Sequence, residues 1–126
     1  MTPLPTLAIT TGEPAGIGPE LIAMLAKRHA AQPFAARLVV LGDQALLAAR
    51  AARIGLAPNF VKFDPTSYPP RSGSIEVWDL PVAVATEPGQ LDPTNAGHVI
   101  TLLERGCDGC ATGAFDALVT APVQKS

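Results

Sequence analysis

The sequence has few aromatic residues, and it lacks the features that mark membrane-spanning and secreted proteins. Aromatic residues make up only 5% of its 126 residues, so a core has to rest on Ala, Leu, Val and Ile. No apolar run approaches the roughly 20 residues that a membrane-spanning helix needs. The N-terminus lacks the basic segment and long apolar stretch of a secretory signal. We therefore expect a cytoplasmic protein that has no membrane partner.

Charge of either sign is also sparse and evenly spread. Nine Lys and Arg residues face eleven Asp and Glu residues, for a net charge of −2, and neither sign forms a block. Contacts to a phosphate backbone require a basic stripe, which is missing here, so we expect no nucleic-acid partner. A hydrophobic content of 48% with 16% charged residues is that of an ordinary globular protein.

Cysteine and histidine are scarce as well. Cys107 and Cys110 form a CxxC pair at the end of a helical pattern, whereas a redox pair lies at a helix start, where the dipole stabilises a thiolate. A zinc site would need two further ligands, and His29 and His98 are the only histidines. We interpret the cysteines as structural or inert and both histidines as ordinary helix residues. We expect no metal ligand in this chain.

What is present is an alternation of apolar strands with amphipathic helices. We expect strands over Leu4–Ile9, Arg37–Leu41, Asn59–Phe63, Ser74–Leu80 and Ala117–Thr120. We expect helices over Pro19–Ala31, from the N-cap Asp43 to about Ile54 before Gly55, and from Asn95 to about Gly106. This order predicts an α/β fold, a three-layer α/β/α arrangement around a mostly parallel sheet. The alternation in Ser74–Leu80 favours an edge position for that strand.

The glycine-rich turn ITTGEPAGIGPE, residues 9–20, is the first candidate site. It joins an expected strand to an expected helix, where backbone N–H groups stabilise an anion. It is neither a Walker A loop, because no Gly-Lys-Ser/Thr follows, nor a dinucleotide fingerprint, because Leu21 occupies the third glycine position. The candidate substrate- or cofactor-binding residues are Thr11, Gly12, Glu13, Gly16, Gly18 and Glu20.

Two alternatives stay open for this turn. Its glycines can equally serve a tight turn or close packing. Glu20, in the first turn of the expected helix, can equally be a partner of the helix dipole.

The second candidate site is the closing segment TAPVQKS, which follows the last expected strand. In a parallel sheet this segment and the first turn lie on the same rim. Lys125 is the candidate catalytic residue, since a lysine there can bind a carboxylate or phosphate, or stabilise a developing enolate. The alternative is a solvated lysine.

Together, ITTGEPAGIGPE, CDGCATGAFDALVT and TAPVQKS resemble the 4-hydroxythreonine-4-phosphate dehydrogenase family of pyridoxal phosphate biosynthesis. The resemblance runs from Thr6 to Ser126. The GIGPE element is also similar to the GDGIGPE turn of the isocitrate and isopropylmalate dehydrogenases, which share this fold in outline. The resemblance implies that residues 1–126 are the N-terminal α/β segment of a longer two-domain dehydrogenase.

The resemblance also implies a reaction. NAD, or NADP, would oxidise the 3-hydroxy group of 4-phosphooxy-L-threonine, and the β-keto acid would decarboxylate to 3-amino-2-oxopropyl phosphate. A divalent metal such as zinc, magnesium or cobalt would polarise the oxygen, held by residues beyond Ser126 in a homodimer. The isolated chain is then expected to be inactive. The alternatives are a relative acting on phosphorylated threonate or erythronate, or a stand-alone phosphate-, nucleotide- or partner-binding module.

Overall fold

The protein is described by a computed structural model that covers residues 5–12, 14–64, 73–81 and 96–121. Five strands form one sheet: β1 (Thr6–Thr10), β2 (Arg37–Gly42), β3 (Phe60–Lys62), β4 (Ile75–Asp79) and β5 (Ala117–Thr120). Three helices accompany it: α1 (Gly18–Ala31), α2 (Gln44–Arg53) and α3 (Ala96–Thr112). Among the described residues, no helix combines the length and hydropathy that a membrane span requires.

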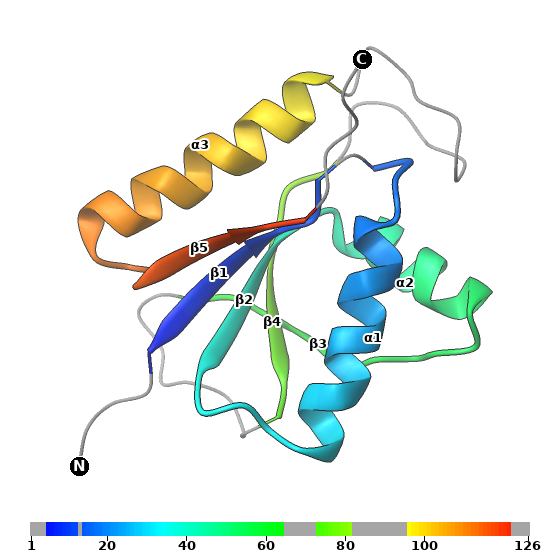
Figure 1. The fold of residues 1–126 in the computed structure, drawn as a ribbon. Coiled ribbons are helices and arrows are strands. Elements are labelled where there is room, and N and C mark those ends of the chain that lie inside the picture. Colours follow the sequence, from blue (N-terminus) through cyan, green and yellow to red (C-terminus); the bar gives the residue numbers. More distant parts are fainter. Residues whose placement is uncertain (1–4, 13, 65–72, 82–95, 122–126) are drawn as a thin grey trace.

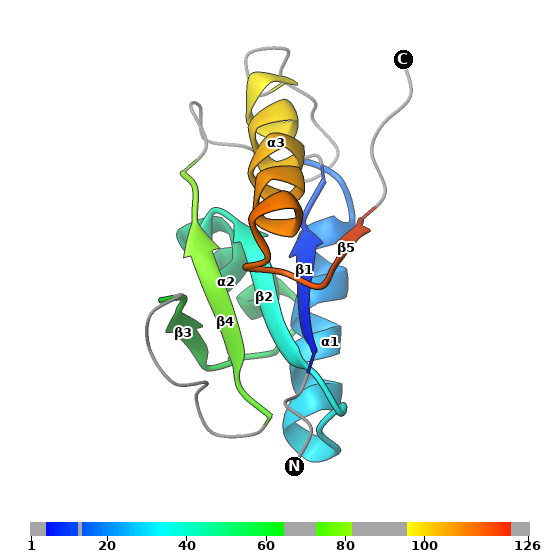
Figure 2. The same cartoon turned by 90° about the vertical axis from the view of Figure 1, so that its left-hand side faces the viewer.

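The sheet has the order β3-β4-β2-β1-β5, and each neighbouring pair is parallel. Helices α1 and α2 cover one face and α3 the other, as Figures 1 and 2 show from two directions. The three-layer α/β prediction is therefore confirmed. It holds because the strands are apolar on both faces, so each face must be covered.

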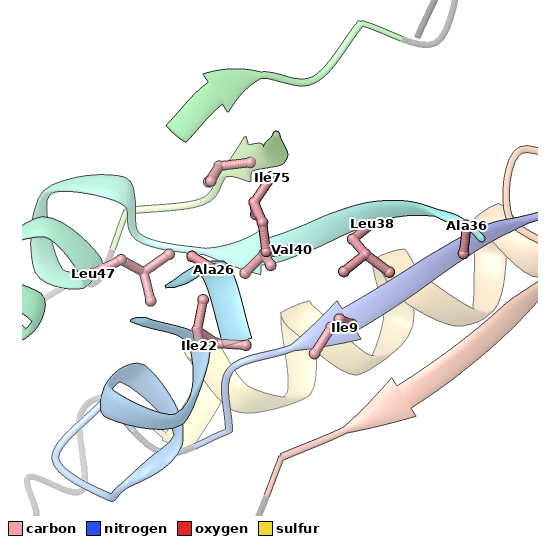
Figure 3. Close-up of a cluster of buried hydrophobic side chains, with 9 residues drawn as sticks. Ile9, Ile22, Ala26, Ala36, Leu38, Val40, Leu47 and Ile75 are labelled. Atoms are coloured by element: carbon pink, nitrogen blue, oxygen red, sulfur yellow. The ribbon is translucent and has the colours of Figure 1, made fainter. Parts of the chain in front are cut away.

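The core lies mainly between the sheet and the α1/α2 layer. Ile22 and Ala26 of α1 and Leu47 of α2 point toward Val40 and Ile75 of the sheet (Figure 3). On the opposite face a smaller cluster packs beneath α3, and it joins Ala8, Val39, Leu41, Leu102 and Phe115.

The predicted ends of α2 are confirmed, and a cap at its start and a glycine after its end explain them. Asp43 caps α2 as predicted, with its Oδ1 accepting a hydrogen bond from the Leu46 N–H at 3.0 Å. Gly55 follows α2 with a φ of 76°, the left-handed conformation that ends helices at glycine. The first strand begins and ends slightly later than predicted, and Leu4 lies outside the described residues.

The edge position predicted for Ser74–Leu80 is wrong. Strand β4 lies between β3 and β2. Its alternating polar residue, Glu76, is only 1% exposed, because its carboxylate pairs with Arg37 of β2 at 2.5 Å. The alternation therefore came from a buried ion pair and not from a solvated face.

The helix predicted to end at about Gly106 continues to Thr112, so Cys107 and Cys110 lie within the last two turns of α3, toward its C-terminal end as predicted. Gly106 does not end α3; at this residue the helix packs closely against Leu118 of β5. A Cβ on Gly106 would lie 2.6 Å from Leu118 Cδ1. Both cysteines are free; Cys107 is exposed and Cys110 packs against the cluster beneath α3.

Candidate functional site

The candidate site lies at the carboxyl edge of β1 and β5. These strands are parallel neighbours in which Thr10 pairs with Thr120, so their carboxyl ends coincide. The Ala121 N–H donates to the Thr10 carbonyl at 3.0 Å. Thr11 and Ala121, the first residues after the two strands, therefore lie close together, and the shared rim of the two whole motifs stays a prediction. Glu13 and Lys125 lie outside the described residues.

The turn after β1 folds tightly back on itself. Gly12 has a φ of 73°, which a residue with a side chain rarely adopts. A Cβ on Gly18 would lie 1.8 Å from the Thr11 carbonyl oxygen and 3.2 Å from Ala121 Cβ. Gly18 is therefore the point at which the start of α1 packs directly on the backbone of Thr11, and Ala121 lies nearby.

The threonines at the end of β1 are buried. Thr10 and Thr11 are 1% and 2% exposed. The Thr11 side chain packs against Gly42, where a Cβ would lie 2.7 Å from Thr11 Cγ2. In this structure Thr11 thus joins the turn to the end of β2, and its hydroxyl does not lie at the surface.

Helix α1 begins without a side-chain cap and with one backbone donor fewer than most helices have. Its N-cap, Ile17, supplies no side-chain hydrogen bond, and Pro19 lacks an N–H. The first backbone N–H groups of a helix have no acceptor within it, and they carry the positive end of its dipole. Ile17 is 62% exposed, whereas the first two residues of the helix, Gly18 and Pro19, are buried.

Arg50 of α2 binds the backbone of this turn and the side chain of Glu20. Its guanidinium donates to the carbonyls of Pro14, at 2.5 Å, and of Gly16. It also donates to both carboxylate oxygens of Glu20, with Nη2 2.7 Å from Oε2. Arg50 is 3% exposed, so this is a buried charge with its partners in place.

The sequence analysis missed Arg50. A signal was available, because Leu47, Arg50 and Ala51 follow helical spacing and all three are buried. An arginine on the apolar face of a helix needs a buried acceptor, and Glu20 is the acceptor in the turn. Glu20 lies in the first turn of α1, as predicted, and its pairing with Arg50 is a role that the sequence did not suggest.

The two histidines are both buried. His29 Nδ1 accepts from the Phe34 N–H at 3.0 Å, and burial lowers the pKa of His29, with a further contribution from Arg28. Burial also lowers the pKa of His98, while Asp43 opposes that shift. Among the described residues, His98 Nε2 is a buried atom without a hydrogen-bond partner.

The described residues do not fit a metal centre. They contain no group of three or more His, Cys, Asp or Glu side chains that could hold an ion. We therefore derive no catalytic step through a metal from these residues.

The chain matches known proteins over most of its length. Residues 34–126 match the model of the family described as pyridoxal phosphate biosynthetic protein PdxA. A 4-hydroxythreonine-4-phosphate dehydrogenase of Aromatoleum aromaticum is 48% identical over 125 residues, which cover 99% of this chain and 36% of that protein. One of Ectopseudomonas mendocina is 47% identical over 121 residues, covering 94% of this chain and 35% of its own length.

Solved structures agree in fold. A crystal structure of a 4-hydroxythreonine-4-phosphate dehydrogenase from Burkholderia phymatum superposes with a TM-score of 0.84 at 27% identity, over 97% of this chain and 37% of that one. One from Klebsiella pneumoniae gives a TM-score of 0.75 at 25% identity, over 96% and 38%. The chain thus spans little more than a third of the relatives that it matches. It belongs to the PdxA family of pyridoxal phosphate biosynthetic proteins.

Proposed function

We propose that this chain is the N-terminal α/β part of a longer two-domain dehydrogenase that oxidises 4-hydroxythreonine 4-phosphate in pyridoxal phosphate biosynthesis. Family membership supports the reaction, and the observation that carries the site is the parallel pairing of β1 with β5, after which the Ala121 N–H donates to the Thr10 carbonyl. This pairing supports the proposal that the segment leading to Lys125 lies on the same rim of the sheet as the glycine-rich turn. Ligands bind at this rim in open parallel sheets.

In this proposal the chain supplies one wall of the cleft. The start of α1 offers backbone N–H groups and a dipole to an anionic part of the substrate, its phosphate or its carboxylate. Lys125 is proposed to stabilise negative charge that develops on the substrate.

The remaining groups are proposed to lie outside this chain. NAD or NADP would accept the hydride from the 3-hydroxy carbon, and a divalent metal would polarise the oxygen of that group. We propose that both are held mainly by residues absent from this sequence, and that the complete protein is a homodimer.

The test compares the complete protein with the 126-residue chain. Each is mixed with 4-phosphooxy-L-threonine, NAD and zinc, and both NADH and 3-amino-2-oxopropyl phosphate are measured. We expect turnover by the complete protein only. Turnover by the 126-residue chain would show that the essential groups lie within it, and a faster reaction of the complete protein with phosphorylated threonate or erythronate would reassign the substrate.

A further inference from the structure

We propose that a surface formed by α1 and β5 is the docking surface for an amphipathic helix from the rest of the longer protein. This surface, called the α1/β5 surface, consists of Ile17, Leu21 and Met24 along α1 and Val119 of β5. The inference rests on the proposed function in one respect only, namely that this chain is part of a longer protein.

Helix α1 carries an apolar stripe on its outer side. Ile17, Leu21 and Met24 are 62%, 41% and 56% exposed, and their spacing of four and three residues places them on one face of the helix. Ile22 and Ala26 lie on the opposite face and pack on the sheet (Figure 3). A surface helix normally turns polar side chains outward, so a continuous apolar stripe there marks a site of interaction.

Strand β5 turns Val119 toward the same side of the sheet as α1. Leu118 packs in the cluster beneath α3, and successive side chains of a strand point to opposite faces. The register agrees, because Val119 pairs with Ile9, which belongs to the core beneath α1 and α2. Ile9 is 7% exposed, whereas Val119 is 49% exposed. The cover on this face therefore stops between β1 and β5.

The order of the strands explains why Val119 is left open. Helix α1 leads from β1 to β2 and α2 from β2 to β3, so both helices pack over the part of the sheet from β1 to β3. Helix α3 covers β5 from the opposite face, as Figure 2 shows. Strand β5 also stands at the end of the described sheet, so one row of its backbone N–H and C=O groups is open to pairing. Apolar side chains and an open strand edge therefore meet at one place.

The rest of the same polypeptide is the occupant that fits this surface. The relatives are nearly three times as long as this chain, so much more chain has to pack in the complete protein. A segment of the same polypeptide is held near the surface at a high effective concentration, which favours it over a second copy. All four residues of the surface are apolar, and the uncovered place continues a layer of helices. An amphipathic helix beside α1 and over Val119 would complete that layer.

Met24 is a native probe of this surface, because oxidation of a methionine by hydrogen peroxide depends on its exposure. Sulfoxide formation at Met24 is followed by peptide mass spectrometry in the complete protein, folded and unfolded in urea. We expect oxidation in the folded protein to be slower by about tenfold, because it requires the docked segment to open. The matched control is Lys27→Met, at an exposed position of the same helix outside the surface, and its residue 27 should react at nearly the unfolded rate. Oxidation of Met24 at the unfolded rate would overturn the proposal.

Photo-crosslinking then identifies the occupant. Benzoylphenylalanine replaces Leu21 in the complete protein, and the same substitution at Lys27 is the control. After irradiation we expect products of monomer mass in which position 21 is joined to residues outside 1–126. Products of dimer mass would show that a second copy occupies the surface, and this result, or the lack of any crosslink to residues outside 1–126, would overturn the proposal. Neither measurement uses turnover, so a different substrate for the enzyme would leave both tests intact.

Discussion

At the scale of single residues, the candidate site depends on very close backbone contacts. Gly18 approaches the Thr11 carbonyl so closely that no side chain fits. The backbone at residue 12 is left-handed, a conformation that favours glycine. Arg50 is buried, and its four hydrogen bonds offset the free-energy cost of burying its charge. The sequence shows that the turn is rich in glycine, and the structure shows why Gly12 and Gly18 have no side chain.

Buried histidines predict a pH dependence of stability. The pKa values of His29 and His98 are lowered from 6.5 in the folded protein, so the unfolded chain binds more protons once the pH falls below about 6.5. The stability gained from keeping these rings neutral is full above that pH and is lost as the pH falls. We expect the urea midpoint to fall between about pH 7.5 and 5.5.

The double variant His29→Gln with His98→Gln is the control for this effect. It removes both titrating groups, so its urea midpoint should change much less over the same interval. An equally steep decline in the double variant would show that other groups cause the loss.

At the scale of elements, the packing of α3 on the sheet explains why the helix passes through its glycines. A Cβ on Gly109 would lie 2.2 Å from the Phe115 ring, so the helix can approach the strand connection only without a side chain there. Glycine lowers helix propensity, which led the sequence analysis to end the helix too early. Tertiary packing overrides that local preference.

The variant Gly109→Ala tests this packing. We expect it to lower the free energy of unfolding by about 1–3 kcal/mol, because the methyl group displaces the Phe115 ring. Gly97→Ala is the matched control in the same helix, since a Cβ there has nothing within 4 Å. It should change stability by less than about 1 kcal/mol, in the stabilising direction. Urea unfolding of both variants gives the comparison, and equal effects would contradict the packing explanation.

At the scale of the whole molecule, the 126-residue chain leaves apolar surface uncovered. Ile17, Met24, Ile100 and Val119 are between 49% and 62% exposed. Val119 lies on β5, an edge strand of the described sheet. The relatives are nearly three times as long, so more chain is available in them to cover such surface.

This exposure predicts different behaviour of the chain and the complete protein. We expect the isolated 126-residue chain to enhance the fluorescence of the apolar dye ANS and to associate as its concentration rises, because open strand edges and apolar patches bind one another. The complete protein should bind less dye per molecule. Equal dye binding by both would show that these side chains remain exposed in the complete protein.

The sequence by itself determined the fold class, most helix and strand positions, and the family. These follow from apolar periodicity, caps and glycine-rich turns, which are local and therefore readable along the chain. Only the tertiary structure decided that β4 is internal, that α3 continues past Gly106, and that Arg50 holds the turn. The physical reason is the same in each case. A buried partner far away in sequence, Arg37 for Glu76, Leu118 for Gly106 and Glu20 for Arg50, outweighs what the local residues favour.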